Sequence, residues 1–198
     1  LDALADPDDA DGDGISGKRG TGRFGWRAQF ERVRAQTAQA FALDMGLSTT
    51  YHPAAAGDCT TAQSACLARS VDGVEVSDEI LESMADYVIN LGPPARDNVD
   101  TPDLLAGRAL FYEIGCSQCH TPSHKTGPHR FPWLADQMIW PYSDLLLHDM
   151  GPGLGDAGGQ EWRTPPLWGL GRHGEVNGNT YYLHDGRAKS LDDAIRWH

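Results

Sequence analysis

The 198 residues are enough for one large or two small domains, and 40% of them are hydrophobic, which is ordinary for a globular protein. The formal net charge of −12 makes the chain a poor ligand for nucleic acid or for an anionic membrane surface, because both are negatively charged. No run of about 18 apolar residues occurs, so we expect no membrane span.

The first 25 residues are polar, acidic and rich in glycine, a composition that predicts loop. Within them Asp9, Asp11 and Asp13 occupy the first, third and fifth positions of a calcium-binding loop, and a glycine follows at the sixth. The glutamate expected at the twelfth position is absent, since Gly20 stands there. A calcium loop and an acidic turn without metal both stay open. The opening sequence reads like the middle of a protein, so we expect a longer parent chain.

Helix signals dominate the rest of the chain. Apolar residues recur at three- and four-residue steps, serine or threonine stands at the expected N-caps, and glycine or proline follows the expected ends. These patterns predict helices at residues 26–45, 78–91, 102–115, a short one at 143–150, and 190–198. No strand pattern is convincing, so we predict an all-α protein with long loops, divided into domains at 1–94 and 95–198.

Four cysteines form two local pairs with different spacings, which indicates two different roles. Cys116, Cys119 and His120 form the sequence CSQCH. Two thiols at this spacing add to the two vinyl groups of a haem, and the histidine that follows binds the iron. A redox dithiol would require a βαβ setting and a zinc site a second Cys/His pair, and neither pattern is present. We therefore predict one covalently attached c-type haem per chain.

Haem attachment of this kind requires an oxidising compartment, so we expect a periplasmic or extracellular protein. Cys59 and Cys66 would then close a short disulfide loop, with two free thiols as the alternative.

Several blocks together resemble the bacterial di-haem oxidoreductases often labelled "thiol oxidoreductase", which are similar to the di-haem cytochrome c peroxidases. The blocks are GRFGWRAQ, AFALDMG, LFYEIGCSQCHTP, YSDLLLHDMGPGL, EWRTPPLWGL and YYLHDGRAKSLDDAIRWH. The resemblance implies two cytochrome c-like α domains with one haem each. Only one CxxCH is present, so residues 1–94 would be the later part of an N-terminal haem domain whose motif lies upstream of Leu1.

The resemblance also implies roles for single residues. In the peroxidases a distal methionine ligand lies fourteen residues after the histidine of an [FL]-H-D-G motif, which corresponds here to His184. The position fourteen residues on is His198, so the resemblance implies His198 as the iron ligand in place of methionine. Trp26 matches a tryptophan that relays electrons between the two haems. Arg163 matches a segment along the haem edge, where it would pair a propionate or remain solvated.

Other candidates come from residue chemistry. Met150 is the alternative sixth ligand, although a methionine more often fills a core. His184 would bond a propionate, line the pocket or be satisfied within its turn. His124, His129, His148 and His173 have no informative spacing, and we expect them on the surface or in loops.

The sequence thus predicts haem-based electron transfer within a peroxidase-like oxidoreductase, with an upstream haem domain or a separate redox protein as partner. The alternative is a stand-alone cytochrome that carries electrons without enzymatic activity. No cysteine pair supports dithiol chemistry, so the label "thiol oxidoreductase" carries little weight.

Overall fold

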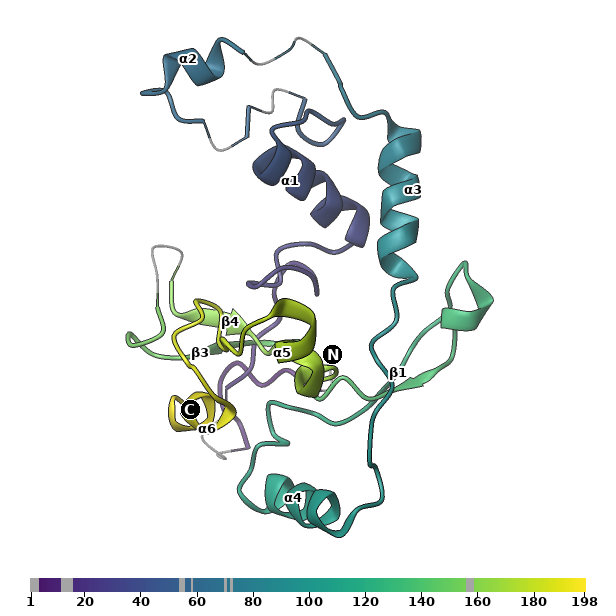
Figure 1. Cartoon of the computed structure of the whole chain (residues 1–198), viewed down its shortest axis with the longest axis vertical. Helices are drawn as coiled ribbons and strands as arrows, with labels where there is room; N and C mark the ends of the chain where they lie inside the picture. Colours follow the sequence, from purple (N-terminus) through teal and green to yellow (C-terminus); the bar gives the residue numbers. More distant parts are fainter. Residues whose placement is uncertain are drawn as a thin grey trace. The chain divides into compact units, whose positions relative to one another are not determined.

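The structure, a computed structural model, describes residues 4–11, 16–53, 56–57, 59–69, 71, 73–155 and 159–198. Figure 1 follows the chain through its helices and strands. The helices are α1 (Val33–Met45), α2 (Ser64–Leu67), α3 (Asp78–Ile89), α4 (Pro102–Glu113), η1 (Pro132–Leu134), η2 (Leu170–Arg172), α5 (His173–Asn177) and α6 (Leu191–Arg196). The strands are β1 (His124–Lys125), β2 (Met138–Ile139), β3 (Leu147–Asp149) and β4 (Glu161–Arg163). Among the described helices, none is both long and apolar enough to cross a bilayer.

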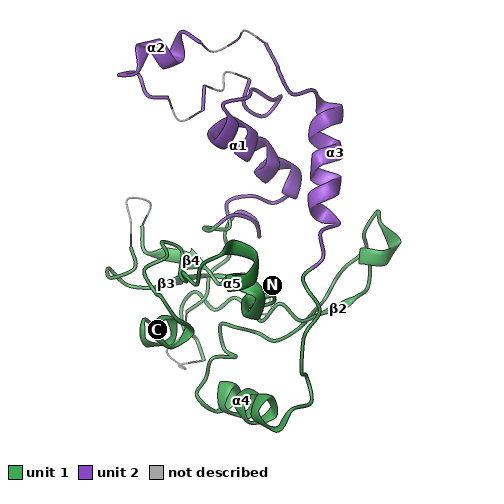
Figure 2. Cartoon of the chain, in the orientation of Figure 1, with its two compact units in different colours: residues 1–20, 26–28, 93–198 green, residues 21–25, 29–92 purple. Residues whose placement is uncertain are grey.

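Two compact units divide the chain, as the colours of Figure 2 show. Unit 1 comprises Leu1–Gly20, Trp26–Ala28 and Pro93–His198, and unit 2 comprises Thr21–Gly25 and Gln29–Gly92. The N-terminal segment therefore groups with the C-terminal half of the chain. The assignment of residues 1–94 to a second haem-type domain stays a prediction.

Unit 2 is built on the packing of α1 against α3. Their shared core contains buried Phe41 and Leu81, with Leu47 packed against it. Helix α1 ends at Gly46, which adopts the left-handed conformation (φ 68°), as expected for this C-cap. The helix begins at Val33 rather than at Trp26 because Phe24 and Phe30 exchange backbone hydrogen bonds of 3.1 and 3.2 Å across a tight turn.

Helix α3 follows its sequence signals closely. Ser77 accepts a hydrogen bond from the N–H of Ile80, and Asp78 and Glu79 lie in the first turn, where carboxylates interact favourably with the helix dipole. The helix buries Leu81 and Ala85, four residues apart on one face. Its start and its buried face were therefore predictable from the sequence.

Unit 1 contradicts the prediction of an all-α, cytochrome c-like fold. It contains two small antiparallel sheets, β1–β2 and β3–β4, and helices account for only 32% of the structure. In the second sheet His148 faces Trp162, and a further bridge joins Lys18 to Leu147. The strands are two or three residues long. Such lengths are too short to show alternating hydrophobicity, which is why no strand pattern is visible in the sequence.

The short helix predicted at 143–150 is wrong for a local reason. Ser143 and Asp144 accept the backbone N–H groups of Leu145 and Leu146 through their own side chains, at 3.0 and 2.9 Å. Such bonds compete with helical hydrogen bonds. Tyr142 and Leu145 also have positive φ values of 54° and 62°, which no α-helix allows. The segment is therefore a strained turn that leads into β3.

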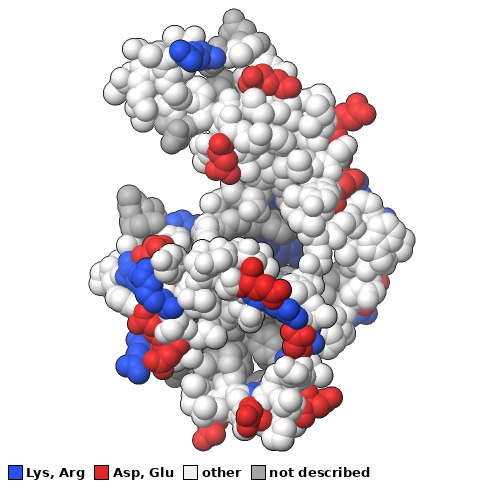
Figure 3. All heavy atoms as spheres, viewed as in Figure 1, with Lys and Arg blue, Asp and Glu red and all other residues white. Residues whose placement is uncertain are grey.

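Acidic and basic side chains alternate over the face of the molecule seen in Figure 3. The described residues include ion pairs near the surface, such as Arg187–Asp185 at 2.6 Å and Arg172–Asp97 at 2.7 Å. Exposed pairs contribute roughly 0–1 kcal/mol each, so they do not determine the fold.

Candidate functional site

The CSQCH motif forms a tight turn directly after α4. The N–H of His120 donates to the carbonyl of Cys116 at 2.9 Å, and Gly115, with φ of 88°, breaks the helix before the motif. Cys116 and Cys119 are free thiols and partly buried. The turn therefore presents two thiols outside any disulfide and an imidazole within five residues.

A backbone group orients the ring of His120. Its Nδ1–H donates to the carbonyl of Tyr142 at 2.9 Å, and no described residue bonds Nε2, the nitrogen that would bind a metal. Burial lowers the pKa of His120, although the bond to Tyr142 opposes this change. Burial therefore favours the neutral imidazole, the form that coordinates iron.

His198 lies beside His120 in unit 1. The ring centroids are 6.2 Å apart, and the ring planes are inclined at 52°. The Nδ1–H of His198 donates to the carbonyl of Ala194 at 3.0 Å, and its Nε2 likewise has no hydrogen-bond partner among the residues that the structure describes. Helix α6, capped by the Ser190 hydroxyl, carries His198 to this position. The structure thus brings together the two histidines that the sequence named as iron ligands.

A buried ion pair, Asp144–His148, lies next to the cysteine turn. Nε2–H of His148 donates to the Asp144 carboxylate at 2.7 Å, and Nδ1–H donates to the carbonyl of Ser16 at 2.9 Å. Only 3% of Asp144 and 8% of His148 is exposed. The expectation that His148 lies on the surface or in a loop is therefore wrong.

The environment of His148 fixes its charge. Burial alone would lower its pKa, but hydrogen bonds to Asp144 and to the Cys119 sulfur, 3.8 Å away, raise it to about 10. His148 is therefore a doubly protonated imidazolium near neutral pH. The four-residue spacing from Asp144 was visible in the sequence, but the buried turn that makes the pair was not.

His184 contributes to an aromatic stack. Its ring lies 3.5 Å from the Trp162 ring at an interplanar angle of 18°, and the Arg27 guanidinium lies 3.8 Å from the centre of the Trp162 ring. The sequence named His184 as a site residue and gave no hint of this stack. Cation and aromatic rings placed in this way attract one another.

The remaining predicted residues occupy different parts of unit 1. Arg163 lies in β4, and burial lowers its pKa, with partial compensation by Asp144. Trp26 is 53% exposed, and its carbonyl accepts the N–H of Arg163 at 2.8 Å. Met150 directly follows β3, and its N–H donates to Gln160 at 3.0 Å. None of these three residues, nor His184, forms a ring contact with His120.

The N-terminal acidic turn brings three carboxylates together. Oxygens of Asp6, Asp9 and Asp11 lie within 4.8 Å of one another. Asp6, which the sequence pattern missed, accepts the N–H groups of Ala10 and Asp11 at 2.9 and 3.3 Å. Asp13 lies outside the described residues.

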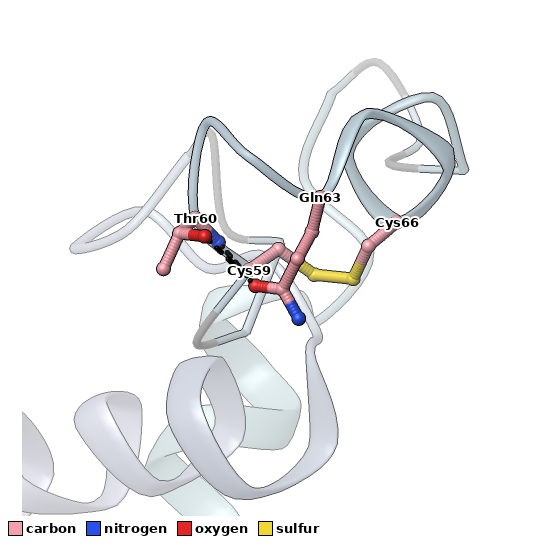
Figure 4. Close-up of a disulfide and its surroundings, with 4 residues drawn as sticks. All are labelled: Cys59, Thr60, Gln63 and Cys66. Carbon is pink, nitrogen blue, oxygen red and sulfur yellow. Dashed lines mark hydrogen bonds between the residues drawn. A yellow bond between two sulfur atoms is a disulfide. The ribbon is translucent and has the colours of Figure 1, made fainter.

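Cys59 and Cys66 form the disulfide that the sequence predicted, with Cα atoms 6.0 Å apart. Figure 4 shows the loop they close, in which Gln63 accepts the N–H of Thr60 at 2.8 Å and its hydroxyl at 3.0 Å. The disulfide belongs to unit 2, whereas CSQCH belongs to unit 1. The two cysteine pairs therefore belong to different units, and a role for each stays a prediction.

Comparison with known proteins gives one match. A family model described as "Di-haem oxidoreductase, putative peroxidase" matches residues 1–198. Neither a curated protein nor a solved structure matches the chain significantly. Because the family model spans the whole sequence, the chain belongs to the di-haem oxidoreductase family, whose members are described as putative peroxidases.

Proposed function

We propose that this chain attaches one c-type haem through Cys116 and Cys119, that His120 and His198 would bind its iron, and that the chain transfers electrons within a peroxidase-like oxidoreductase. The observation that carries the proposal is the placement of the two imidazoles. Each donates its Nδ1–H to a backbone carbonyl, no described residue bonds either Nε2, and the ring centroids are 6.2 Å apart.

This spacing suits coordination of one ion by both rings. A metal–imidazole bond of about 2 Å on each side, plus on the order of 1 Å from each nitrogen to its ring centre, gives a separation of about 6 Å. The observed 6.2 Å agrees with this value. Met150 remains the alternative sixth ligand, but no comparable ring or sulfur contact to His120 supports it among the described residues.

The apolar side chains near the motif fit a large flat cofactor. Helix α4 buries none of its residues, and Leu105 and Leu110 are 41% and 53% exposed. Phe111 on the same helix lies 6.4 Å from the His120 ring. Covering such side chains with a porphyrin would be favourable, because it removes apolar surface from water.

A haem bound here would supply one-electron chemistry through its iron. The residues of the chain would supply the setting: the Tyr142 carbonyl orients His120 and increases its basicity as a ligand. The partly buried guanidinium of Arg163 is suited to pairing a propionate. Two strong nitrogen ligands favour a low potential and leave no coordination position for a substrate, so the chain is suited to outer-sphere electron transfer.

The family is di-haem, whereas the sequence holds a single Cys-x-x-Cys-His motif. We therefore propose that the partner is a second haem, on an upstream domain or another protein, with Trp26 as a candidate relay. A stand-alone electron carrier is the second candidate, since one closed haem site would suffice for it. The disulfide supports an oxidising compartment, and we place the protein in the periplasm or outside the cell.

Haem attachment is tested by denaturing the purified protein after export through a haem-attachment pathway. We expect the intact mass to exceed that of the polypeptide by one haem, and we expect Cys116→Ala combined with Cys119→Ala to abolish this increase. A haem count of zero in the wild-type chain would refute the proposal.

The sixth ligand is tested by comparing His198→Ala with Met150→Ala. We expect His198→Ala to convert a low-spin optical spectrum into a high-spin or water-ligated one, whereas Met150→Ala stays low-spin. The reverse pattern would assign the ligand to Met150.

Calcium is the second candidate ligand of the chain, at the turn of Asp6, Asp9 and Asp11. An acidic turn without metal would have the same internal hydrogen bonds, so the geometry is compatible with a calcium site and with a metal-free turn. Titration calorimetry distinguishes these two alternatives. Calcium binding should raise the melting temperature by mass action, and absence of binding up to millimolar calcium would leave the metal-free turn.

A further inference from the structure

We propose that the Asp144–His148 pair is a positioning device for the axial histidine: it holds the 142–146 turn in the strained form from which the Tyr142 carbonyl accepts the His120 Nδ1–H. This inference concerns residues outside the ligand set and rests on the proposed haem function.

The turn is strained and would not adopt this form without support. Tyr142 and Leu145 both lie in the left-handed region, at φ 54° and 62°. A non-glycine residue in that region costs on the order of 1–3 kcal/mol and persists only where the surroundings fix it. The Tyr142 carbonyl that meets His120 belongs to one of these two residues.

The two residues between them provide part of the anchoring. The Ser143 hydroxyl donates to the Thr164 carbonyl at 2.6 Å, and the Asp144 N–H donates to the Cys119 carbonyl at 2.8 Å. The turn is thus tied both to the residue after β4 and to the cysteine motif itself.

The ion pair completes this anchoring. One carboxylate oxygen of Asp144 accepts from Leu146 at 2.9 Å, and the other accepts from His148 at 2.7 Å. His148 in turn donates to Ser16, so that its imidazolium has a partner at each nitrogen. A buried pair of this kind contributes little net stability, but removal of one partner is strongly unfavourable because the other is left charged and buried.

The space beside the His148 ring at Gly17 has no room for a side chain. A Cβ at this position would lie 2.9 Å from His148 Cε1 and 3.1 Å from Leu146 Cδ1. The N-terminal segment therefore approaches the imidazole closely. The methyl group of Gly17→Ala would displace the His148 ring, while the residues that hydrogen-bond to His148 would remain unchanged.

The test uses the haem-loaded chain with His148→Gln, which retains a donor for Asp144 but loses the charge, and Gly17→Ala, which displaces the ring. The matched control is His173→Gln, a half-buried histidine of unit 1 whose ring packs near Tyr182 at 5.2 Å. We expect both test variants to raise the reduction potential, because His120 becomes a weaker donor when its bond to Tyr142 weakens, and the control to leave it unchanged.

A second readout requires no haem. Hydrogen exchange of the His120 Nδ1–H, followed by NMR, should be about tenfold faster in His148→Gln and Gly17→Ala than in the wild type, as expected for loss of one good hydrogen bond. If the His148→Gln variant does not fold, the reduction potential and the exchange rate of Gly17→Ala test the proposal by themselves.

The outcomes separate the two proposals. A chain that binds no haem but shows faster exchange refutes the proposed function and supports the positioning role. A haem-loaded chain in which both variants leave the potential and the exchange rate unchanged overturns the positioning role. A control that shifts as much as the variants also overturns it, since any histidine change would then have the same effect.

Discussion

The two units of this chain are stabilised in different ways. Unit 2 has an apolar core in which Phe41 and Leu81 pack between two helices, and the Cys59–Cys66 disulfide closes a short loop within it. Unit 1 also buries leucines, among them Leu146 and Leu154, but the buried charged residues of the described chain, Asp144 and His148, both belong to it, and its longest helix buries no residue. Unit 2 therefore resembles an ordinary small core, whereas unit 1 is organised around a polar turn and the motif proposed to bind haem. Four experiments test this difference.

The largest effect is expected from pH in unit 1. The pKa of His148 is raised to about 10 in the folded chain, against an ordinary value of 6.5. A raised pKa contributes stability that is fully present below about pH 6.5 and is lost as pH rises through about 10. We expect the wild type to lose several kcal/mol of unfolding free energy over this range.

The measurement is urea unfolding at several pH values for the wild type and His148→Gln. Other groups titrate in the same range, so the difference between the two proteins isolates His148 and its partners Asp144 and Cys119. If the unfolding free energies of the two proteins change with pH in parallel, the Asp144–His148 pair contributes no pH-dependent stability.

Leu81→Ala should damage unit 2. Leu81 is fully buried, and removal of its side chain should cost about 3 kcal/mol, within the usual range for a buried leucine. We expect denaturant unfolding to shift while the His120 Nδ1–H exchange rate in unit 1 stays at its wild-type value. A change of that rate by Leu81→Ala would contradict the separate roles of the two units.

Reduction of Cys59–Cys66 is expected to have an intermediate effect. A disulfide that closes a loop of sequence separation 7 should stabilise unit 2 by about 2–3 kcal/mol through the restricted unfolded chain. Melting curves with and without reductant measure this loss. The Cys59→Ala, Cys66→Ala double variant is the control, and it should not respond to reductant.

The smallest effects concern the two serine N-caps. Ser77→Ala in unit 2 and Ser190→Ala in unit 1 should each cost about 1 kcal/mol, since each hydroxyl accepts one N–H of the first turn. Only Ser190→Ala should alter the optical spectrum of the haem-loaded chain, because α6 carries His198. Ser83→Ala, within α3, is the matched control and should change stability by less than about 0.5 kcal/mol.

The parts of the fold that the sequence predicted are those fixed by local physics. The Ser77 cap, the Gly46 ending and the apolar spacing of α3 each act within a few residues, and the structure confirms them. Helix α4 also begins at Pro102 as predicted, although Thr101 makes no side-chain cap. The strands β3 and β4 depend on a partner some fourteen residues away, which periodicity does not reveal.

The candidate site shows the same division. The cysteine spacing named Cys116, Cys119 and His120 directly, and the family resemblance supplied His198. Asp144 and His148 were not predicted, because their role depends on Ser16, which lies 132 residues from His148 in the sequence. Contacts of that range come only from the folded chain.

That long separation sets the order in which the protein matures. Unit 2 has all its residues by position 92, whereas the Ser16–His148 hydrogen bond joins residues 132 positions apart, so unit 1 closes only after most of the chain is available. His148 also lies 29 residues after Cys119, whose sulfur is 3.8 Å from its Nδ1. We expect the two thiols of the exported chain to be most accessible to a haem-attaching enzyme before His148 closes against Cys119.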